Sequence, residues 1–349
     1  MSLMPTSQPG FFDLEERYEA LSQAGDPLVK LNDLIPWEEF RFSLKRALAK
    51  KRKSNAGRQP YDLVLMFKVL VLQSLYNISD HQVEYQIRDR FSFLRFLNLT
   101  VESRIPDEKT IWLFRDNLVQ ANAIGKLFER FSHYLDRQGY KAECGSMIDA
   151  SIVEAPKQRN SRESNQKIKE GEIPKHWKEK PNKLRQKDVD ARWTKKNNET
   201  HYGYKNHINA DTKNKLVRKF TVTTASESDT KSFELLLNKN SEDKRVWADS
   251  AYRTKTNERI IQERGFKDRL HYRVRPGGGG WIMGGEKREN ARRTKIRKRV
   301  EHVFGFIENS LGGKFIRTIG LKRARWKIGM MNLVYNMKRY EQLLRLEYA

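Results

Sequence analysis

The chain has 349 residues, enough for two domains, with 69 basic and 44 acidic side chains and a net charge of +25. Such a surface attracts polyanions, so we expect nucleic acid as the partner. The single cysteine, Cys144, excludes an internal disulfide. The most apolar run, residues 63–72, is interrupted by Lys68 and is too short to cross a bilayer.

The first 140 residues show mostly helical patterns, and we expect them to form an all-α N-terminal DNA-binding domain. Residues 1 to about 35 have little periodicity and several prolines, so we expect an arm there. A capping box, Ser79 with Gln82, begins a helix that we expect to reach the apolar cluster ending at Leu97. Further helices are predicted at 37–53, where a basic run begins at Lys50, and at 60–76, 106–118 and 123–138.

The helices on either side of residues 98–105 resemble a helix-turn-helix, although their connection is longer than the usual tight turn. Many helical domains share this layout without touching DNA. Both interpretations therefore stay open for this segment.

From residue 141 the pattern changes to that of a mixed sheet flanked by helices. Glycines at 277–280 and 284–285 lack the spacing and the strand-to-helix context of a phosphate-binding loop, so we reject a nucleotide site. We predict strands at 146–153, 245–248 and 269–274, a hairpin over 204–224, and helices at 230–237, 257–264, 294–308 and about 322–346.

The segment 155–200 differs from its surroundings because it holds 14 basic and 7 acidic residues but few large apolar ones. Its composition predicts an extended or loosely helical insertion that cannot bury a core of its own. A solvated loop would need no function, but the excess of positive charge also suits a role in gripping phosphates.

Three carboxylates suggest a divalent-metal site. Asp149 closes the apolar pair Met147-Ile148, Asp249 closes the run 246–248, and Glu301 stands among the apolar helix positions Val300, Val303, Phe304 and Ile307, with Arg297 one turn before it. A carboxylate on an apolar face is costly unless a charge offsets it, so Arg297 could simply pair with Glu301. Two strand carboxylates and one helix carboxylate also make a divalent-metal site, which can support phosphodiester chemistry without a protein nucleophile.

The chain resembles a bacterial DDE transposase of the insertion-sequence-five family, within the larger insertion-sequence-four type grouping. The N-terminal helices from 61 to 118 are similar to that family's first domain, and four motifs follow them: Ile148-Asp149-Ala150, His201-Tyr-Gly-Tyr-Lys205-Asn-His207, Trp247-Ala-Asp249-Ser-Ala-Tyr252 and Arg297-x3-Glu301. The larger grouping often has Tyr and Lys where this chain has Thr294 and Glu308, so roles attached to that Tyr and Lys are not carried over.

The resemblance implies an α/β fold with an RNase H-like catalytic core over 141–349, two Mg²⁺ or Mn²⁺ ions held by Asp149, Asp249 and Glu301, and cleavage and strand transfer at terminal inverted repeats. It also implies double-stranded DNA as partner and a homodimer on DNA. We expect a bacterial cytoplasmic, nucleoid-associated protein, because the first residues lack a secretory signal. Our candidates for DNA contacts are Lys205, Arg297, Lys298, Lys322, Arg323 and Arg325.

Two alternatives remain. A stand-alone metal-dependent nuclease could share the fold, and strand-transfer products would distinguish it. A DNA-binding regulator with an inactive core is disfavoured, because such a core has no need to keep three costly carboxylates.

Overall fold

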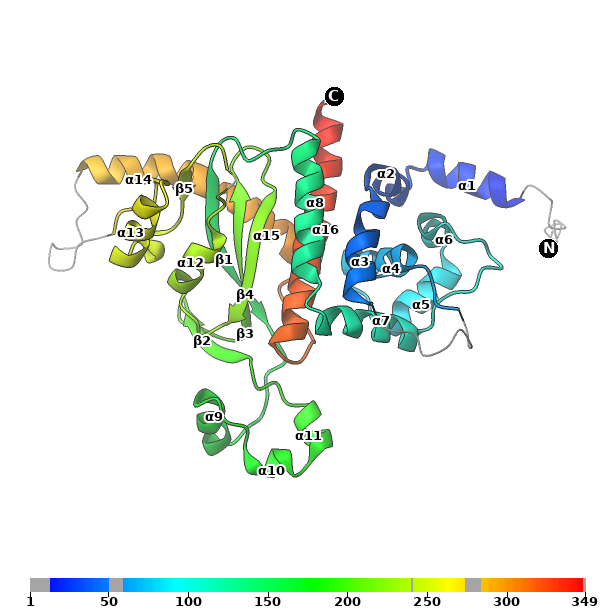
Figure 1. The fold of residues 1–349 in the computed structure, drawn as a ribbon, viewed down its shortest axis with the longest axis horizontal. Helices are drawn as coiled ribbons and strands as arrows, with labels where there is room; N and C mark the ends of the chain where they lie inside the picture. The colour runs from blue at the N-terminus through cyan, green and yellow to red at the C-terminus, as the bar shows by residue number, and fades with distance from the viewer. Residues whose placement is uncertain (1–12, 50–58, 240, 274–283, 348–349) are drawn as a thin grey trace, which may run out of the picture. The chain divides into compact units, whose positions relative to one another are not determined.

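The structure is a computed structural model that describes residues 13–49, 59–239, 241–273 and 284–347 (Figure 1). The chain divides into two compact units, Met1–Arg115 and Asp116–Ala349. The expected basic run beginning at Lys50 and the glycines at 277–280 lie outside the described residues.

The first unit is all helical. Its elements are α1 (Asp13–Gln23), α2 (Pro27–Leu34), the 3₁₀ helix η1 (Trp37–Phe40), α3 (Arg41–Ala47), α4 (Leu63–Tyr76), α5 (Asp80–Asp89), α6 (Phe91–Leu97) and most of α7 (Glu108–Gln120). The expected arm is wrong for residues 13–34, which form two helices. Leu28 and Leu31 of α2 are buried, and α2 packs on α6. Tertiary contacts therefore stabilise a helix that the weak periodicity of the sequence did not predict.

The helix α4 is the centre of this unit. Asp62 caps it by accepting hydrogen bonds from the backbone N–H groups of Val64 and Leu65, and Asn77 ends it in the left-handed conformation. Its middle is buried on all sides, including Lys68, whose ammonium donates to Asn32 Oδ1 (2.7 Å) and the Phe96 carbonyl (3.0 Å). Burial lowers the pKa of Lys68 to about 8.

The second unit contains a six-stranded mixed sheet. Its strands are β1 (Ser146–Glu154), β2 (Arg192–Lys196), β3 (Glu199–Asp211), β4 (Val217–Thr224), β5 (Arg245–Trp247) and β6 (Lys267–Asp268). The order is β2-β3-β1-β5-β6, with β4 also paired to β3. Strands β3 and β4 run antiparallel as the predicted hairpin, whereas β5 pairs parallel to β1 and β6 parallel to β5.

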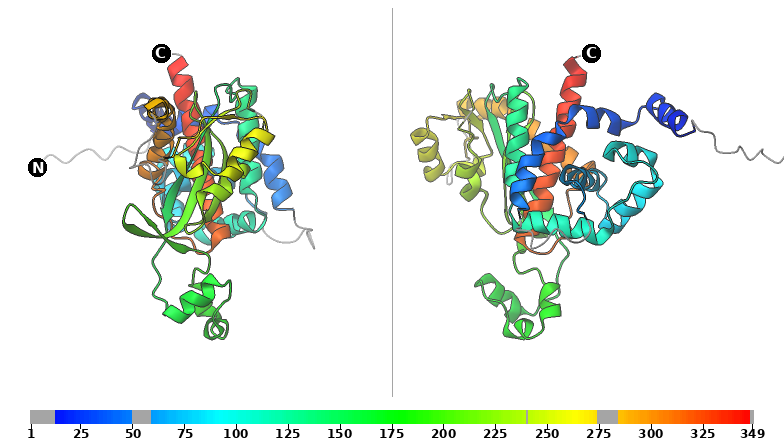
Figure 2. Two further views of the ribbon diagram at one scale, coloured as in Figure 1. Left: turned by 90° about the vertical axis from the view of Figure 1, so that its left-hand side faces the viewer. Right: turned by 45° about the vertical axis from the view of Figure 1, so that its right-hand side comes forward.

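Helices cover both faces of this sheet (Figures 1 and 2). On one face lie α12 (Asp229–Leu236), η2 (Ser250–Tyr252) and α13 (Lys255–Glu263), around a core that includes Ile148, Phe233 and Tyr252. The other face carries α8 (Ile124–Arg137), α14 (Gly284–Arg297), α15 (Arg299–Asn309) and α16 (Leu321–Glu347). The predicted fold class, an RNase H-like α/β core after helices, is confirmed.

The long helix α16 is fixed to the sheet by buried amides. Asn332 and Asn206 of β3 exchange side-chain hydrogen bonds at 2.9 and 3.0 Å. Asn336 likewise accepts from the N–H of Val217 in β4 and donates to its carbonyl. Helix α8 packs on α16, and its Phe128 ring lies 4.9 Å from the Phe220 ring of β4, so this helix is part of the second compact unit.

The basic insertion is helical, which was one of the two predicted forms, but the prediction that it buries no core of its own is wrong. It forms three short helices, α9 (Arg162–Lys169), α10 (Lys175–Lys178) and α11 (Pro181–Arg185), which project from the ends of β1 and β2 (Figures 1 and 2). Trp177 is only 2% exposed and Ile168 only 6%. The composition misled because a few buried side chains, Trp177 and Ile168 among them, are enough for a small core.

Two other predicted elements differ. Only Lys267–Asp268 pair as a strand where 269–274 was expected, and the predicted helix 294–308 is two helices that meet at Lys298. No single described helix is long and apolar enough to cross a membrane; α4 and α5 meet that test only as a pair bent by 103°.

Candidate active site

Asp149 on β1 and Asp249, just after the end of β5, occupy equivalent positions along two neighbouring parallel segments. Met147 of β1 is in register with Trp247 of β5, and each aspartate stands two residues further along. Adjacent strands lie about 4.8 Å apart, so the two carboxylates share one edge of the sheet. Each accepts a hydrogen bond from the next backbone N–H, at 2.8 Å from Ala150 and 2.6 Å from Ser250.

The carboxylate of Asp149 is held by Arg297, the last residue of α14. The Arg297 Nη1 donates to Asp149 Oδ2 at 3.0 Å, and both side chains are about one-fifth exposed. Burial raises the pKa of Asp149; the Ala150 N–H and Arg297 oppose that rise, and nearby Asp249 adds to it. Arg297 therefore pairs with Asp149, not with Glu301 as its sequence spacing suggested.

Asp249 is more open, with half of its side chain exposed, and lies beside His271. The backbone N–H of His271 donates to the Ala248 carbonyl, which brings the imidazole Nδ1 to 3.8 Å from Asp249 Oδ1. Burial, followed by the charge of Arg297, lowers the pKa of His271. Three buried polar atoms here have no hydrogen-bond partner among the residues that the structure describes: His271 Nε2, Arg297 Nε and the Tyr252 hydroxyl oxygen.

Glu301 is exposed on α15, and its carboxylate makes no hydrogen bond or ion pair with any described residue. Our interpretation of it as a carboxylate held against an apolar face is therefore wrong, although its neighbours Val300, Val303, Phe304 and Ile307 are buried as predicted. Within the described ranges, no three His, Cys, Asp or Glu side chains are close enough to hold a metal ion.

Lys205 lies on the other face of the sheet from Asp149. It pairs with Ile152, an odd number of residues from Asp149 along β1, and side chains alternate between faces. Its Nζ donates to Asp229 Oδ1 and the Glu227 carbonyl, both at 2.8 Å. These contacts engage Lys205 with α12, so we no longer consider it a phosphate ligand near Asp149.

The other predicted DNA contacts lie on the surface. Lys298, at the junction of α14 and α15, and Lys322, in the first turn of α16, are exposed. Arg323 forms an ion pair with Asp116 at 3.0 Å, whereas Arg325 is half-buried and has no carboxylate partner among the described residues.

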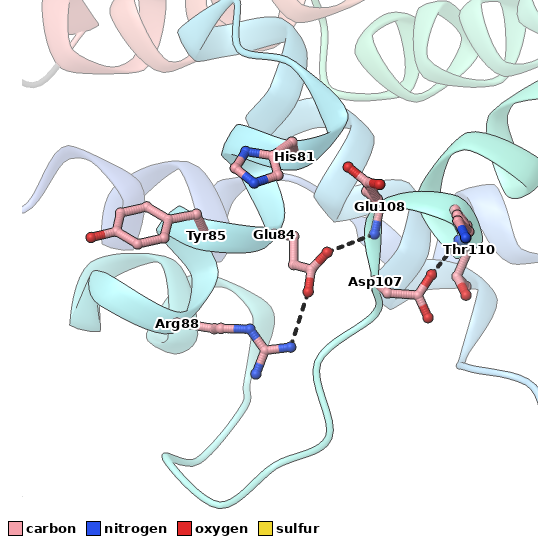
Figure 3. Close-up of a pocket in the computed structure, with 8 residues that line it drawn as sticks. His81, Glu84, Tyr85, Arg88, Asp107, Glu108 and Thr110 are labelled. Atoms are coloured by element: carbon pink, nitrogen blue, oxygen red, sulfur yellow. Dashed lines mark hydrogen bonds and ion pairs between the residues drawn. The ribbon is translucent and has the colours of Figure 1, made fainter.

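The first unit has a groove of about 710 Å³ between α5 and the start of α7 (Figure 3). Glu84 joins the two helices, because its Oε2 accepts from the Glu108 N–H at 2.8 Å and its Oε1 pairs with Arg88 at 3.1 Å. An ion pair between Arg115 and Asp80 adds a second link. Tyr85 is 57% exposed, so α5 presents an aromatic and basic face beside α7.

Comparison with known protein families identifies both parts of the chain. Residues 16–117 match a transposase domain family (DUF772), and residues 140–337, more than half of the chain, match the transposase DDE domain. The chain belongs to the DDE transposases. No solved structure matches it.

As a DDE transposase, the protein is a DNA transposase and an enzyme that depends on a divalent metal ion. The residues present fit such an ion in donor chemistry. Asp149 and Asp249 offer carboxylate oxygens, the ligands that hard divalent cations prefer, from adjacent strands at one edge of the transposase sheet.

Sequence reasoning missed two contacts in the transposase site. His271 falls in the predicted strand 269–274, and pairing of that segment beside Ala248 would have placed it near Asp249. Glu308, where the larger grouping often has Lys, accepts a hydrogen bond from Ser151 Oγ at 2.5 Å and so ties α15 to β1. Nothing in the local sequence around Glu308 signals that contact.

Proposed function

We propose that Asp149, Asp249 and Glu301 are the catalytic carboxylates of this transposase, and that they hold two Mg²⁺ ions. The observation that carries the proposal is the equivalent placement of Asp149 on β1 and of Asp249 just after β5, the parallel neighbour of β1. The two carboxylates are close enough for the charge of Asp249 to raise the pKa of Asp149. Bound divalent ions supply charge stabilisation and a lowered pKa for attacking water. The three motifs also favour the insertion-sequence-five family.

In this proposal Arg297 is a positioning residue. Its hydrogen bond to Asp149 fixes one carboxylate oxygen at 3.0 Å and offsets part of the cost of burying the charge. Water, and later a freed 3′-hydroxyl, would attack the phosphodiester in line with the leaving oxygen. Lys298, Lys322, Arg323 and Arg325 would contact backbone phosphates around the site, where exposed cations position DNA without reading sequence.

The experiment that tests this proposal follows a labelled duplex carrying the element's own end. With Mg²⁺ we expect cleavage and then joined products, and neither product after chelation. Light scattering of the protein–end complex should give the mass of two chains, because joining uses two ends. Cleavage without joined products would instead support a stand-alone nuclease, and activity in chelator would contradict the metal site.

We also propose that residues 1–140 supply most of the sequence-specific recognition. The support is the rigid link of α5 to α7 through Glu84, with His81, Tyr85 and Arg88 spaced along one face of α5 (Figure 3). A linked helix of this kind suits the major groove, where base edges are read.

Tyr85→Ala in the full chain is expected to lower the preference for the element's ends over random duplex by about 5- to 100-fold, since one lost base contact costs about 1–3 kcal/mol. Competition binding measures that ratio. The matched control is Phe42→Ala, which removes another exposed aromatic ring from the same unit, on α3. An equal loss in both variants would refute recognition through α5.

A further inference from the structure

Ten of the 14 basic side chains of the insertion fall into two groups. Two of them point inward and build its fold. The Lys187 Nζ lies 5.2 Å from the centre of the Trp177 ring and donates to Asn160 Oδ1 at 2.7 Å. Arg192 donates to the Ile168 carbonyl at 2.8 Å, near the end of α9. These cations are used as structural groups.

The second group points outward. Residues 162–185 hold eight basic and four acidic residues, and all eight basic side chains are exposed. Within the described part of the chain, none of the eight pairs with a carboxylate. They are Arg162, Lys167, Lys169, Lys175, Lys178, Lys180, Lys183 and Arg185. Because like charges repel, a folded unit that keeps eight unpaired cations is suited to an external polyanion.

The base of this unit is fixed to the catalytic core. Asp188 accepts from the Tyr204 hydroxyl at 2.7 Å and from the Gly320 N–H at 3.2 Å. Asp190 accepts from the Leu321 N–H, the first residue of α16, at 2.7 Å. Lys322, the residue after Leu321, is exposed in the first turn of α16, so the base of the insertion joins the core next to a further exposed cation.

We infer that α9–α11 and the first turn of α16 form one preformed surface that binds the phosphate backbone of double-stranded DNA without regard to base sequence. The inference rests on the proposed function, because the partner is the DNA on which the transposase acts. Six of the eight exposed cations are lysines, which contact phosphates as point charges. The buried Trp177 core means that binding needs no folding of this segment.

The test measures binding of the full chain to a short random-sequence duplex as salt is raised from about 50 to about 200 mM. The variant changes five exposed side chains of α10, α11 and their junction to Gln: Lys175, Lys178, Lys180, Lys183 and Arg185. Each lost phosphate contact flattens the plot of log affinity against log salt by about 0.9, so we expect a slope smaller by about 2 to 4 units.

The control removes the same charge elsewhere on the second unit, by changing five other exposed lysines to Gln: Lys126, Lys231, Lys239, Lys255 and Lys267. We expect this variant to keep the wild-type slope. If the slope flattens equally in both variants, the effect comes from the lower net charge alone and the inference is overturned. An unchanged slope in the first variant would overturn it as well. Thermal unfolding checks that both variants are folded.

The same binding assay separates this inference from the proposed function. Asp149→Asn is expected to keep the wild-type salt slope, because the slope is read from binding and needs no cleavage. Cleavage could depend on Asp149 while the five α10–α11 changes leave the salt slope of binding unchanged. That result would support the proposed function and refute only the inferred binding surface. A slope that flattens in Asp149→Asn would show that the site itself supplies the nonspecific contacts, and would overturn the surface.

Discussion

Asp149→Asn, Asp249→Asn and Glu301→Gln are each expected to slow DNA cleavage by at least about a thousandfold, because transition-state charge stabilisation depends on each ligand. The amides keep the size of the carboxylates, so the sheet edge keeps its shape. Binding to the element's end should stay within about twofold, since exposed cations away from the site supply the grip on phosphates. Single-turnover cleavage and equilibrium binding measure the two effects separately.

The control for these variants is Glu263→Gln, which neutralises a carboxylate on α13 that only pairs with Arg259 one turn earlier. It should cleave at the wild-type rate. Glu301 is the sharpest of the three tests, because its carboxylate is exposed and bonds to no described residue. If Glu301→Gln cleaves normally while Asp149→Asn does not, its assignment is wrong, and Glu308, bonded to Ser151, becomes the next carboxylate to substitute.

Gly203→Ala is expected to destabilise the second unit by more than about 3 kcal/mol, the range of severe overpacking and backbone strain. Gly203 has φ +154° in β3, between β1 and β2, and an added Cβ would lie 2.2 Å from the Val153 carbonyl oxygen. The next nearest atom is the Ala155 backbone N at 2.9 Å. Since both neighbours of the added Cβ are backbone atoms, no side chain can move aside to relieve the clash. Urea unfolding of the full chain would show the loss.

Gly125→Ala is the matched control, because Gly125 lies in α8 with no atom within 4 Å of an added Cβ. Alanine has the better helix propensity, so this variant should gain about 0.5–1 kcal/mol. Equal stability of the two variants would mean that the strands move apart at Gly203 at little cost.

Local signals predicted most of the elements. Ser79 caps α5 through the Gln82 N–H, as its capping box predicted, and the hairpin, α12 and α13 lie within a few residues of their expected places. The sequence also indicated that Asp149 and Asp249 stand at the ends of short apolar runs. These features depend on residues a few positions apart, where helix caps and strand alternation act.

Non-local contacts escaped prediction. The sheet face on which Lys205 lies depends on its register with Ile152. The helix break at Lys298 lets Arg297 of α14 reach Asp149, while Glu308 of α15 reaches Ser151. The core of the insertion depends on Trp177 meeting Lys187 ten residues later. None of these is encoded in a periodicity, because each depends on how separate segments meet.

The amides of α16 have a consequence for the order in which the protein can be completed during synthesis. Asn206 lies in β3 and Val217 begins β4 of the catalytic sheet, yet their partners Asn332 and Asn336 are more than a hundred residues further along the chain. Until those residues leave the ribosome, polar groups in the centre of the sheet have only water as a partner. The strands that carry Asp149 and Asp249 are therefore made long before the helix that buries their neighbours, and the nuclease core closes among the last events of translation.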